Sequence, residues 1–98
     1  MSVYAVTYVY APDSIAARDR ARPAHRDHLQ ALCADGAVLV SGPLPATDDE
    51  PDGALIVVTA PSAAEADALL GTDPFRREGL VAEVSVREWV PVIGGFAG

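Results

Sequence analysis

His25 is the residue whose type and position most clearly suggest chemistry. In a helix, which turns by about 100° per residue, it shares one face with Leu29 and Leu32, so an imidazole lies within an apolar stripe. A buried imidazole needs a hydrogen-bond partner, and histidine is the side chain that titrates nearest neutral pH. The position therefore predicts either a general acid or base, or a core histidine satisfied by a backbone carbonyl.

Asp73 is the second candidate, and it also has two interpretations. It directly precedes Pro74, and an Asp before Pro is typical of a helix N-cap. A carboxylate can also orient an imidazole and stabilise its cation, as in His–Asp pairs generally. The two roles are compatible, because one carboxylate oxygen can accept from the backbone and the other from a ring.

Four further residues are candidate substrate-binding residues. Arg22 could attract an anionic group, and Ser41 ends a strand just before a Gly-Pro pair. Tyr8 belongs to a tyrosine-rich stripe that is typical of a core, although one phenol of that stripe could line a cleft. Phe75 follows Asp73 in the same turn, which would form one wall of a pocket.

The composition excludes several other functions. Seven Arg and no Lys face fourteen Asp and Glu, so the net charge is −7, which argues against nucleic acid and anionic membranes as partners. His28 lies one turn after His25, but two His and one Cys form no zinc-type cluster, so we expect no metal. There is no phosphate-binding loop or serine-nucleophile motif, and Cys33 is expected to be a core residue rather than a nucleophile.

The sequence also gives an expected location. No apolar run approaches the roughly 20 residues of a membrane span, and the N-terminus lacks the basic start and long apolar segment of a signal peptide. We therefore expect a soluble cytoplasmic protein.

The elements that must position these residues can be read from patterning, capping and turn residues. Pro23 predicts a first helix that is split, because proline disfavours helix at the preceding residue. The expected elements are a strand 3–10, a short helix ending within 18–22, a second helix to about 34, strands 37–42 and 54–60, a helix from the Ser62 cap to Gly71, a helical turn after Asp73 and a strand 80–91. Pro43 is expected to end the second strand.

This order predicts one domain over residues 1–98, a ferredoxin-like βαββαβ sandwich of the α+β class. Its antiparallel four-stranded sheet would carry the helices on one face only. The other face would present Val3, Ala5 and Val9, or the alternate residues of the same strand, together with Trp89, and is too apolar for water. We therefore expect a homodimer through this open sheet face, with the tail at 92–96, including Phe96, able to cover part of it.

The ordered set of short motifs resembles the YciI-like (YCII-related) family over nearly the whole chain. The motifs are Arg22-Pro23-Ala24-His25, Leu29, Leu32, Asp35-Gly36, Gly42-Pro43, Asp73-Pro74-Phe75, Gly79 and Val84-Ser85-Val86. The resemblance implies a dimeric α/β-barrel type of ferredoxin-like fold, related to muconolactone isomerase. It also implies a catalytic pair at His25 and Asp73. The family pattern varies at His28, at Ser41 and in the acidic loop 47–52, so it assigns them no role.

The resemblance further implies lyase- or isomerase-like proton chemistry without a cofactor, on a small, often hydroxylated aromatic compound or a lactone. A non-catalytic small-ligand-binding or accessory dimer, using the same pocket, is the alternative. A haem- or metal-dependent oxygenase on the same scaffold would need an axial ligand.

Overall fold

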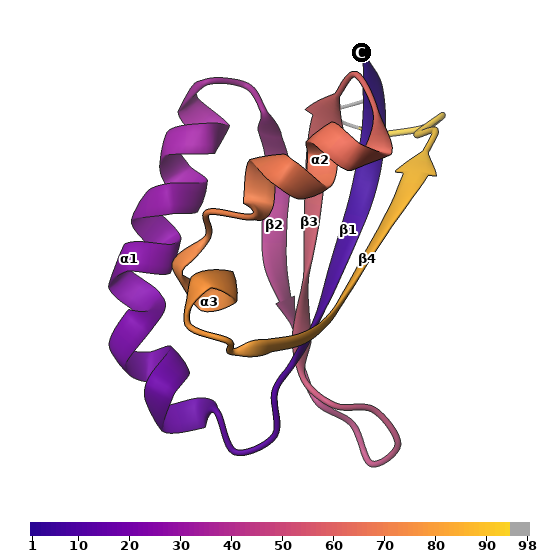
Figure 1. Ribbon diagram of the computed structural model, residues 1–98. Coiled ribbons are helices and arrows are strands. Elements are labelled where there is room, and N and C mark those ends of the chain that lie inside the picture. The colour runs from indigo at the N-terminus through magenta and orange to yellow at the C-terminus, as the bar shows by residue number, and fades with distance from the viewer. Residues whose placement is uncertain (95–98) are drawn as a thin grey trace.

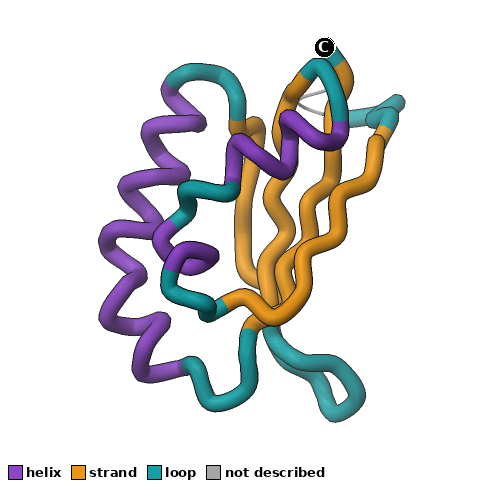
Figure 2. The backbone as a smooth tube through the Cα atoms, viewed as in Figure 1, coloured by secondary structure: helices purple, strands orange, loops and turns teal. Residues whose placement is uncertain are grey.

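The fold is a four-stranded antiparallel sheet with three helices on one face. The computed structural model describes residues 1–94. Its elements are β1 (Ser2–Tyr10), α1 (Ile15–Ala34), β2 (Val38–Leu44), β3 (Gly53–Ala60), α2 (Ala63–Leu70), α3 (Pro74–Arg77) and β4 (Val81–Trp89). The strand order is β2-β3-β1-β4, and the helices lie on the same side of the sheet (Figures 1 and 2). The expected α+β ferredoxin-like class is confirmed.

The core lies between the sheet and the helices because side chains alternate along the two central strands. Tyr4, Val6 and Tyr8 of β1 are buried on the helix-covered face, beside Ile56 and Val58 of β3. A second, smaller cluster is formed where α1 meets α3, from Ala21, Phe75 and Leu80. The site residues described below lie at this second cluster.

The first helix is continuous, so the expected split at Pro23 is wrong. α1 has twenty residues with Pro23 inside it. Proline removes one backbone hydrogen bond and costs about 3 kcal/mol in a helix interior. The buried face runs through both halves of α1, as Arg18, Ala21, His25 and Leu29, so packing on either side of Pro23 keeps the helix in one piece.

α1 ends at Ala34, two residues before Gly36. Gly36 has a positive φ of 84°, and its N–H donates to the carbonyl of Cys33, while the N–H of Ala37 donates to that of Leu32. These two bonds form a Schellman motif, which requires a left-handed residue that glycine supplies without strain. The chain can therefore turn directly from α1 into β2.

The second strand is longer than expected, because Pro43 does not end it. β2 continues through Pro43, which pairs with Ala54, to Leu44, which pairs with Gly53. β2 is an edge strand, so a residue without an N–H is tolerated there.

The face of the sheet opposite the helices is partly apolar in the single chain. Val3, Ala5, Thr7 and Val9 of β1 are half-buried there, while Leu55 and Trp89 are exposed. Val92 and Ile93 are exposed too, and Phe96 lies outside the described residues. Within residues 1–94 no helix is both long and apolar enough to cross a membrane.

Candidate active site

His25 and Asp73 meet, although 48 residues separate them in the sequence. Nδ1 of His25, on α1, lies 2.7 Å from Oδ1 of Asp73, the residue that precedes α3. His25 is 8% exposed and Asp73 is fully buried. The two groups therefore form a direct hydrogen bond away from bulk water, where it is stronger than at the surface.

Asp73 serves as helix cap and imidazole partner at the same time. Its Oδ1 accepts a second hydrogen bond, from the N–H of Phe75 at 3.0 Å, which caps α3. Its Oδ2 accepts from the hydroxyl of Tyr8 at 2.9 Å. The cap and the ring thus share one oxygen, rather than taking one each as the sequence suggested.

These contacts fix the ionisation state of Asp73. Burial raises the pKa of the carboxyl, but hydrogen bonds from His25, the Phe75 amide and Tyr8 outweigh burial and leave that pKa below its ordinary value. Burial, together with the neighbouring Asp73 charge, raises the pKa of Tyr8. At neutral pH the pair is therefore a carboxylate and a neutral phenol that donates to it.

The ionised carboxylate also sets the tautomer of His25. A carboxylate can only accept, so Nδ1 of His25 must carry the proton that it donates. Nε2 then presents its lone pair, and no hydrogen bond from residues 1–94 occupies it. An imidazole in this state can accept a proton at Nε2 while Asp73 stabilises the resulting cation.

Phe75 holds the plane of the imidazole. The rings of His25 and Phe75 stack with centroids 3.9 Å apart and an interplanar angle of 2°. The hydrogen bond to Asp73 fixes the ring's rotation, and the stack fixes its tilt. His25 is thus preorganised in one orientation before any ligand binds.

A cavity of about 670 Å³ lies beside this pair, bounded by α1, β2, the end of the β2–β3 loop and α3. His25, Phe75, Arg22 and Ser41 line it, so the structure brings together four of the six residues proposed from the sequence. Its size suits a small organic ligand.

The other two proposed residues lie behind the cavity. Tyr8 is 0% exposed and is absent from the cavity wall, so its hydroxyl positions Asp73 rather than contacting a ligand. Asp73 likewise reaches the cavity only through the His25 ring. Tyr8 was proposed to bind substrate, and the geometry gives it this supporting place instead.

The structure also gives the positions of Cys33 and His28, the other two residues considered as nucleophile or metal ligand. Cys33 was expected in the core, but it is exposed and lines the cavity. His28 is half-buried at the helix edge, with Nε2 2.8 Å from the Thr72 hydroxyl. In the described part of the chain no group of three or more His, Cys, Asp or Glu could hold a metal ion.

The structure adds Arg18, Tyr10 and Asp52, which also line the cavity. Arg18 lies seven positions before His25, a spacing that places two residues on the same helix face. That periodicity could have identified Arg18, but the expected break at Pro23 assigned the two residues to different helices. Asp52 is the last residue of the acidic loop 47–52, to which the family resemblance assigns no role, and it forms an ion pair with Arg18 at 2.8 Å.

Comparison with known proteins gives both sequence and structural relatives. The chain is 34% identical over 86 residues to Protein YciI of Escherichia coli O6:H1 (strain CFT073), covering 82% of this chain and 88% of that protein. Protein YciI of Shigella flexneri matches equally.

Among solved structures, 5-chloro-2-hydroxyhydroquinone dehydrochlorinase from Burkholderia phenoliruptrix AC1100, in complex with 2,5-dihydroxybenzoquinone, is 26% identical with a TM-score of 0.73. The match covers 89% of this chain and 92% of the dehydrochlorinase. PA3566 from Pseudomonas aeruginosa shares the fold, with a TM-score of 0.55 at 17% identity over 93% of each chain. The profile of the YCII-related domain matches residues 2–90. With nearly the whole chain matched, this protein belongs to the YCII-related family.

Proposed function

We propose that this protein is a cofactor-independent lyase or isomerase, in which His25 and Asp73 move a proton on a small hydroxylated aromatic compound or lactone. The observation that carries the proposal is the His25–Asp73 hydrogen bond of 2.7 Å, with Nε2 of His25 left unoccupied beside a cavity. His25 is the catalytic residue, while Asp73, Tyr8 and Phe75 position it.

The proposed step begins with His25 as a general base. Nε2 takes a proton from a carbon or hydroxyl of the ligand, and the electrons of the broken bond form a new C=C or C=O bond. In a lyase, the leaving group departs with its own electron pair, and the imidazolium then returns its proton to solvent. In an isomerase, the imidazolium returns the proton to another atom of the same molecule. Neither route needs an oxidant or a reductant.

Asp73 makes this step easier by stabilising the imidazolium. The carboxylate is already ionised and already hydrogen-bonded to Nδ1, so no reorganisation accompanies the charge on the ring. A positioned acid or base of this kind typically contributes about 10²–10⁴-fold to a rate.

The dehydrochlorinase supports the substrate class. That enzyme acts on a chlorinated hydroxyhydroquinone, and the match between the two structures covers 89% of this chain. Loss of HCl from such a ring needs no oxidant or reductant. One hydroxyl proton is removed and the chlorine-bearing carbon takes up a proton, which gives the keto tautomer. Removal of a second hydroxyl proton then forms the quinone as chloride departs, so a base that takes up and returns protons can promote both steps. We include in the proposal a homodimer through the open sheet face and the cytoplasmic location expected from the sequence.

The test compares two histidines of one helix. His25→Asn removes the proposed base, and His28→Asn removes an imidazole one turn away that does not line the cavity. Wild type is assayed by ultraviolet absorbance against 5-chloro-2-hydroxyhydroquinone and a panel of small phenols and lactones. We expect turnover that falls at least about 100-fold in His25→Asn and stays within a few-fold in His28→Asn.

Two results would overturn the proposal. Turnover that survives in His25→Asn would remove His25 as the base. Binding of 2,5-dihydroxybenzoquinone or panel compounds by calorimetry, with no turnover of any compound, would favour the non-catalytic binding protein that uses the same pocket.

A further inference from the structure

Arg18 is a buried cation in the cavity wall with part of its guanidinium unused. Its side chain is 7% exposed. Nε donates to the Ser14 hydroxyl at 2.9 Å, and Nη2 donates to Oδ2 of Asp52 at 2.8 Å. Nη1 has no hydrogen-bond partner among residues 1–94. Nη1 is not among the buried polar atoms that lack a partner, so it is accessible, and Arg18 lines the cavity. This free donor is therefore available to an acceptor on a ligand.

The surroundings hold Arg18 in place at some local cost. Ser14 occupies the N-cap position of α1, yet its side chain makes no capping hydrogen bond. Its hydroxyl instead donates to the carbonyl of Ala11 and accepts from Arg18. A serine at this position usually caps the helix, so its hydroxyl holds the guanidinium here instead of stabilising the helix end. The guanidinium also lies over the Tyr10 ring, 4.1 Å from its centroid.

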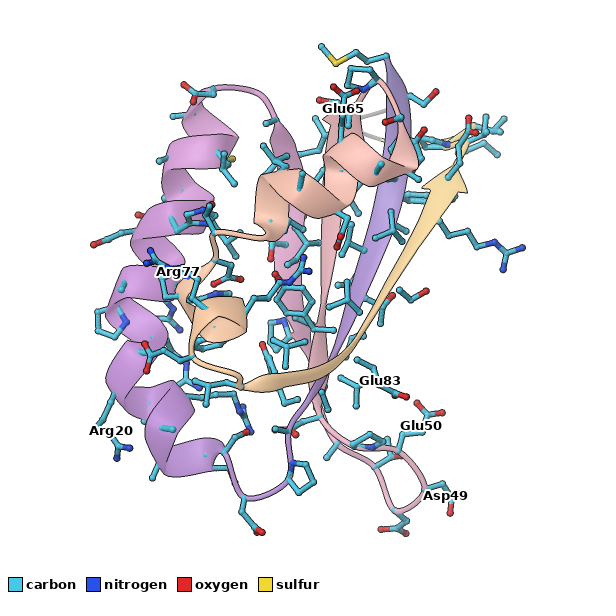
Figure 3. All side chains as sticks on the ribbon, in the orientation of Figure 1. Arg20, Asp49, Glu50, Glu65, Arg77 and Glu83 are labelled. Carbon is cyan, nitrogen blue, oxygen red and sulfur yellow. The ribbon has the colours of Figure 1, made fainter. Side chains whose placement is uncertain are left out.

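The charge of the cavity is opposite to that of the protein. The chain carries −7, but the described residues that line the cavity include three arginines, Arg18, Arg22 and Arg26, and one carboxylate, Asp52. Arg22 is also paired with Asp19, which does not line the cavity. Other acidic side chains, such as Asp49 and Glu50, lie at the tip of the β2–β3 loop (Figure 3). A positive cavity in an acidic protein selects for a negatively charged ligand.

Arg18 and His25 lie at two ends of one wall. Seven positions separate them on α1, which is two turns and roughly 10 Å. Between them the Tyr10 ring contacts the Phe75 ring edge-on, with centroids 5.6 Å apart, and Phe75 stacks on His25. A ligand that reaches both ends would lie along this aromatic wall.

We propose that the ligand is anionic, and that Arg18 binds its charged oxygen through Nη1 while the opposite end of the ligand meets Nε2 of His25. Arg18 is thus a specificity-determining residue. The inference rests on the proposed function only for the role of His25, because anion binding can be measured without turnover. A carboxylate and an ionised phenol share the chemistry that Arg18 recognises.

The test uses matched probes in calorimetry. 3-Hydroxybenzoate and 3-hydroxybenzamide have the same shape but differ in charge, and 4-nitrophenol reports its ionisation by its absorbance when bound. We expect wild type to bind the benzoate about 10- to 100-fold more tightly than the amide, which is the range for a hydrogen bond to a charged group. A bound 4-nitrophenol in its ionised form would identify phenolates as ligands in addition to carboxylates. Equal affinity for the benzoate and the amide would overturn the inference.

The variants separate recognition from a merely structural role. Arg18→Gln should abolish the preference for the benzoate, and Arg18→Lys should keep part of it. Arg20→Gln removes the same charge from the outer side of α1 (Figure 3) and should leave the preference unchanged. If Arg18→Gln does not fold, Asp52→Asn remains informative, because removing the competing carboxylate should raise benzoate affinity several-fold. A preference that persists in Arg18→Gln, or falls in Asp52→Asn, contradicts the inference.

The two proposals fail separately. His25→Asn should lose turnover but keep the preference for the benzoate over the amide. If a neutral compound is turned over through His25 and no charge preference exists, the role of Arg18 is wrong and the proposed function stands. If the charge preference exists and no compound is turned over, the role of Arg18 stands and the proposed function is wrong.

Discussion

Replacing Asp73 by Asn tests the central pair with the smallest change of shape. The backbone N–H of Phe75 determines the orientation of the side-chain amide in the Asp73→Asn variant. The NH2 group of that amide cannot face the N–H, because both are donors. The amide oxygen of the Asp73→Asn variant must therefore stay at the Oδ1 position, where it still accepts from the Phe75 amide and from Nδ1 of His25. The NH2 group then faces the Tyr8 hydroxyl, which can rotate and accept.

The magnitude follows from this geometry. In a Ser-His-Asp protease the corresponding Asp-to-Asn change lowers the rate about 10⁴-fold, because the imidazole adopts the wrong tautomer. Here the cap of α3 keeps the correct tautomer, so the loss is limited to the charge that stabilises the imidazolium. A hydrogen bond to a charged group is worth about 1.5–3 kcal/mol, so we expect the rate to fall about 10- to 100-fold.

The assay needs no known substrate. A His28→Gln background leaves His25 as the single imidazole of the chain. Nitrogen-15 NMR of that ring at neutral pH then shows which nitrogen carries the proton, and we expect Nδ1 both with Asp73 intact and in the Asp73→Asn variant.

One result would refute the reasoning directly. If His25 carries its proton on Nε2 in the Asp73→Asn variant, the Phe75 amide does not control the orientation of the side chain at position 73. The rate should then fall about 10⁴-fold, as it does where the tautomer is wrong, and the cap and the imidazole would not share an oxygen as described.

Three further predictions concern stability and assembly. The pKa of Tyr8 is raised in the folded state, so the contribution of this phenol to stability is complete below pH about 10, its ordinary pKa, and is lost as the pH rises above that value. Tyr8→Phe should therefore reduce the loss of stability at alkaline pH in denaturant titrations. An unchanged pH profile would contradict this prediction. Gly53→Ala should destabilise the fold by about 1–3 kcal/mol or more, because the added Cβ would lie 1.9 Å from the Tyr8 carbonyl oxygen. Urea unfolding measures this loss. Wild-type stability in the variant would mean that β1 and β3 can move apart at this point without cost. Sedimentation at micromolar concentration should give a dimer of about 20 kDa from the 10.2 kDa chain. Covering several hundred Å² of apolar sheet stabilises the dimer by on the order of 10 kcal/mol. A monomer would rule out the proposed homodimer.

Much of the fold could be predicted because its signals are local. The alternation in β1, the apolar run of β3 and the Ser62 and Asp73 caps each act within a few residues, and all appear where the sequence places them. The errors came from proline. A local rule says that Pro23 breaks a helix, but burial along the whole face of α1 overrides it.

The candidate site could be predicted only in part, because it depends on contacts between distant segments. His25 stood out as an imidazole on an apolar face, yet its pairing with Asp73 came from a family resemblance. No local pattern indicates that Tyr8 reaches Oδ2 of Asp73, or that Asp52 anchors Arg18, since these contacts span 65 and 34 residues. Only the folded topology brings them together.

The shared oxygen of Asp73 couples the motion of α3 to the state of the imidazole. α3 is a single turn of four residues, and the Phe75 amide can exchange with solvent only when its bond to Asp73 opens. The same opening disturbs the acceptor of His25 and moves the stacked Phe75 ring. Hydrogen exchange at this one amide therefore measures the free energy of this local opening, which sets the fraction of molecules in which the His25 orientation is lost.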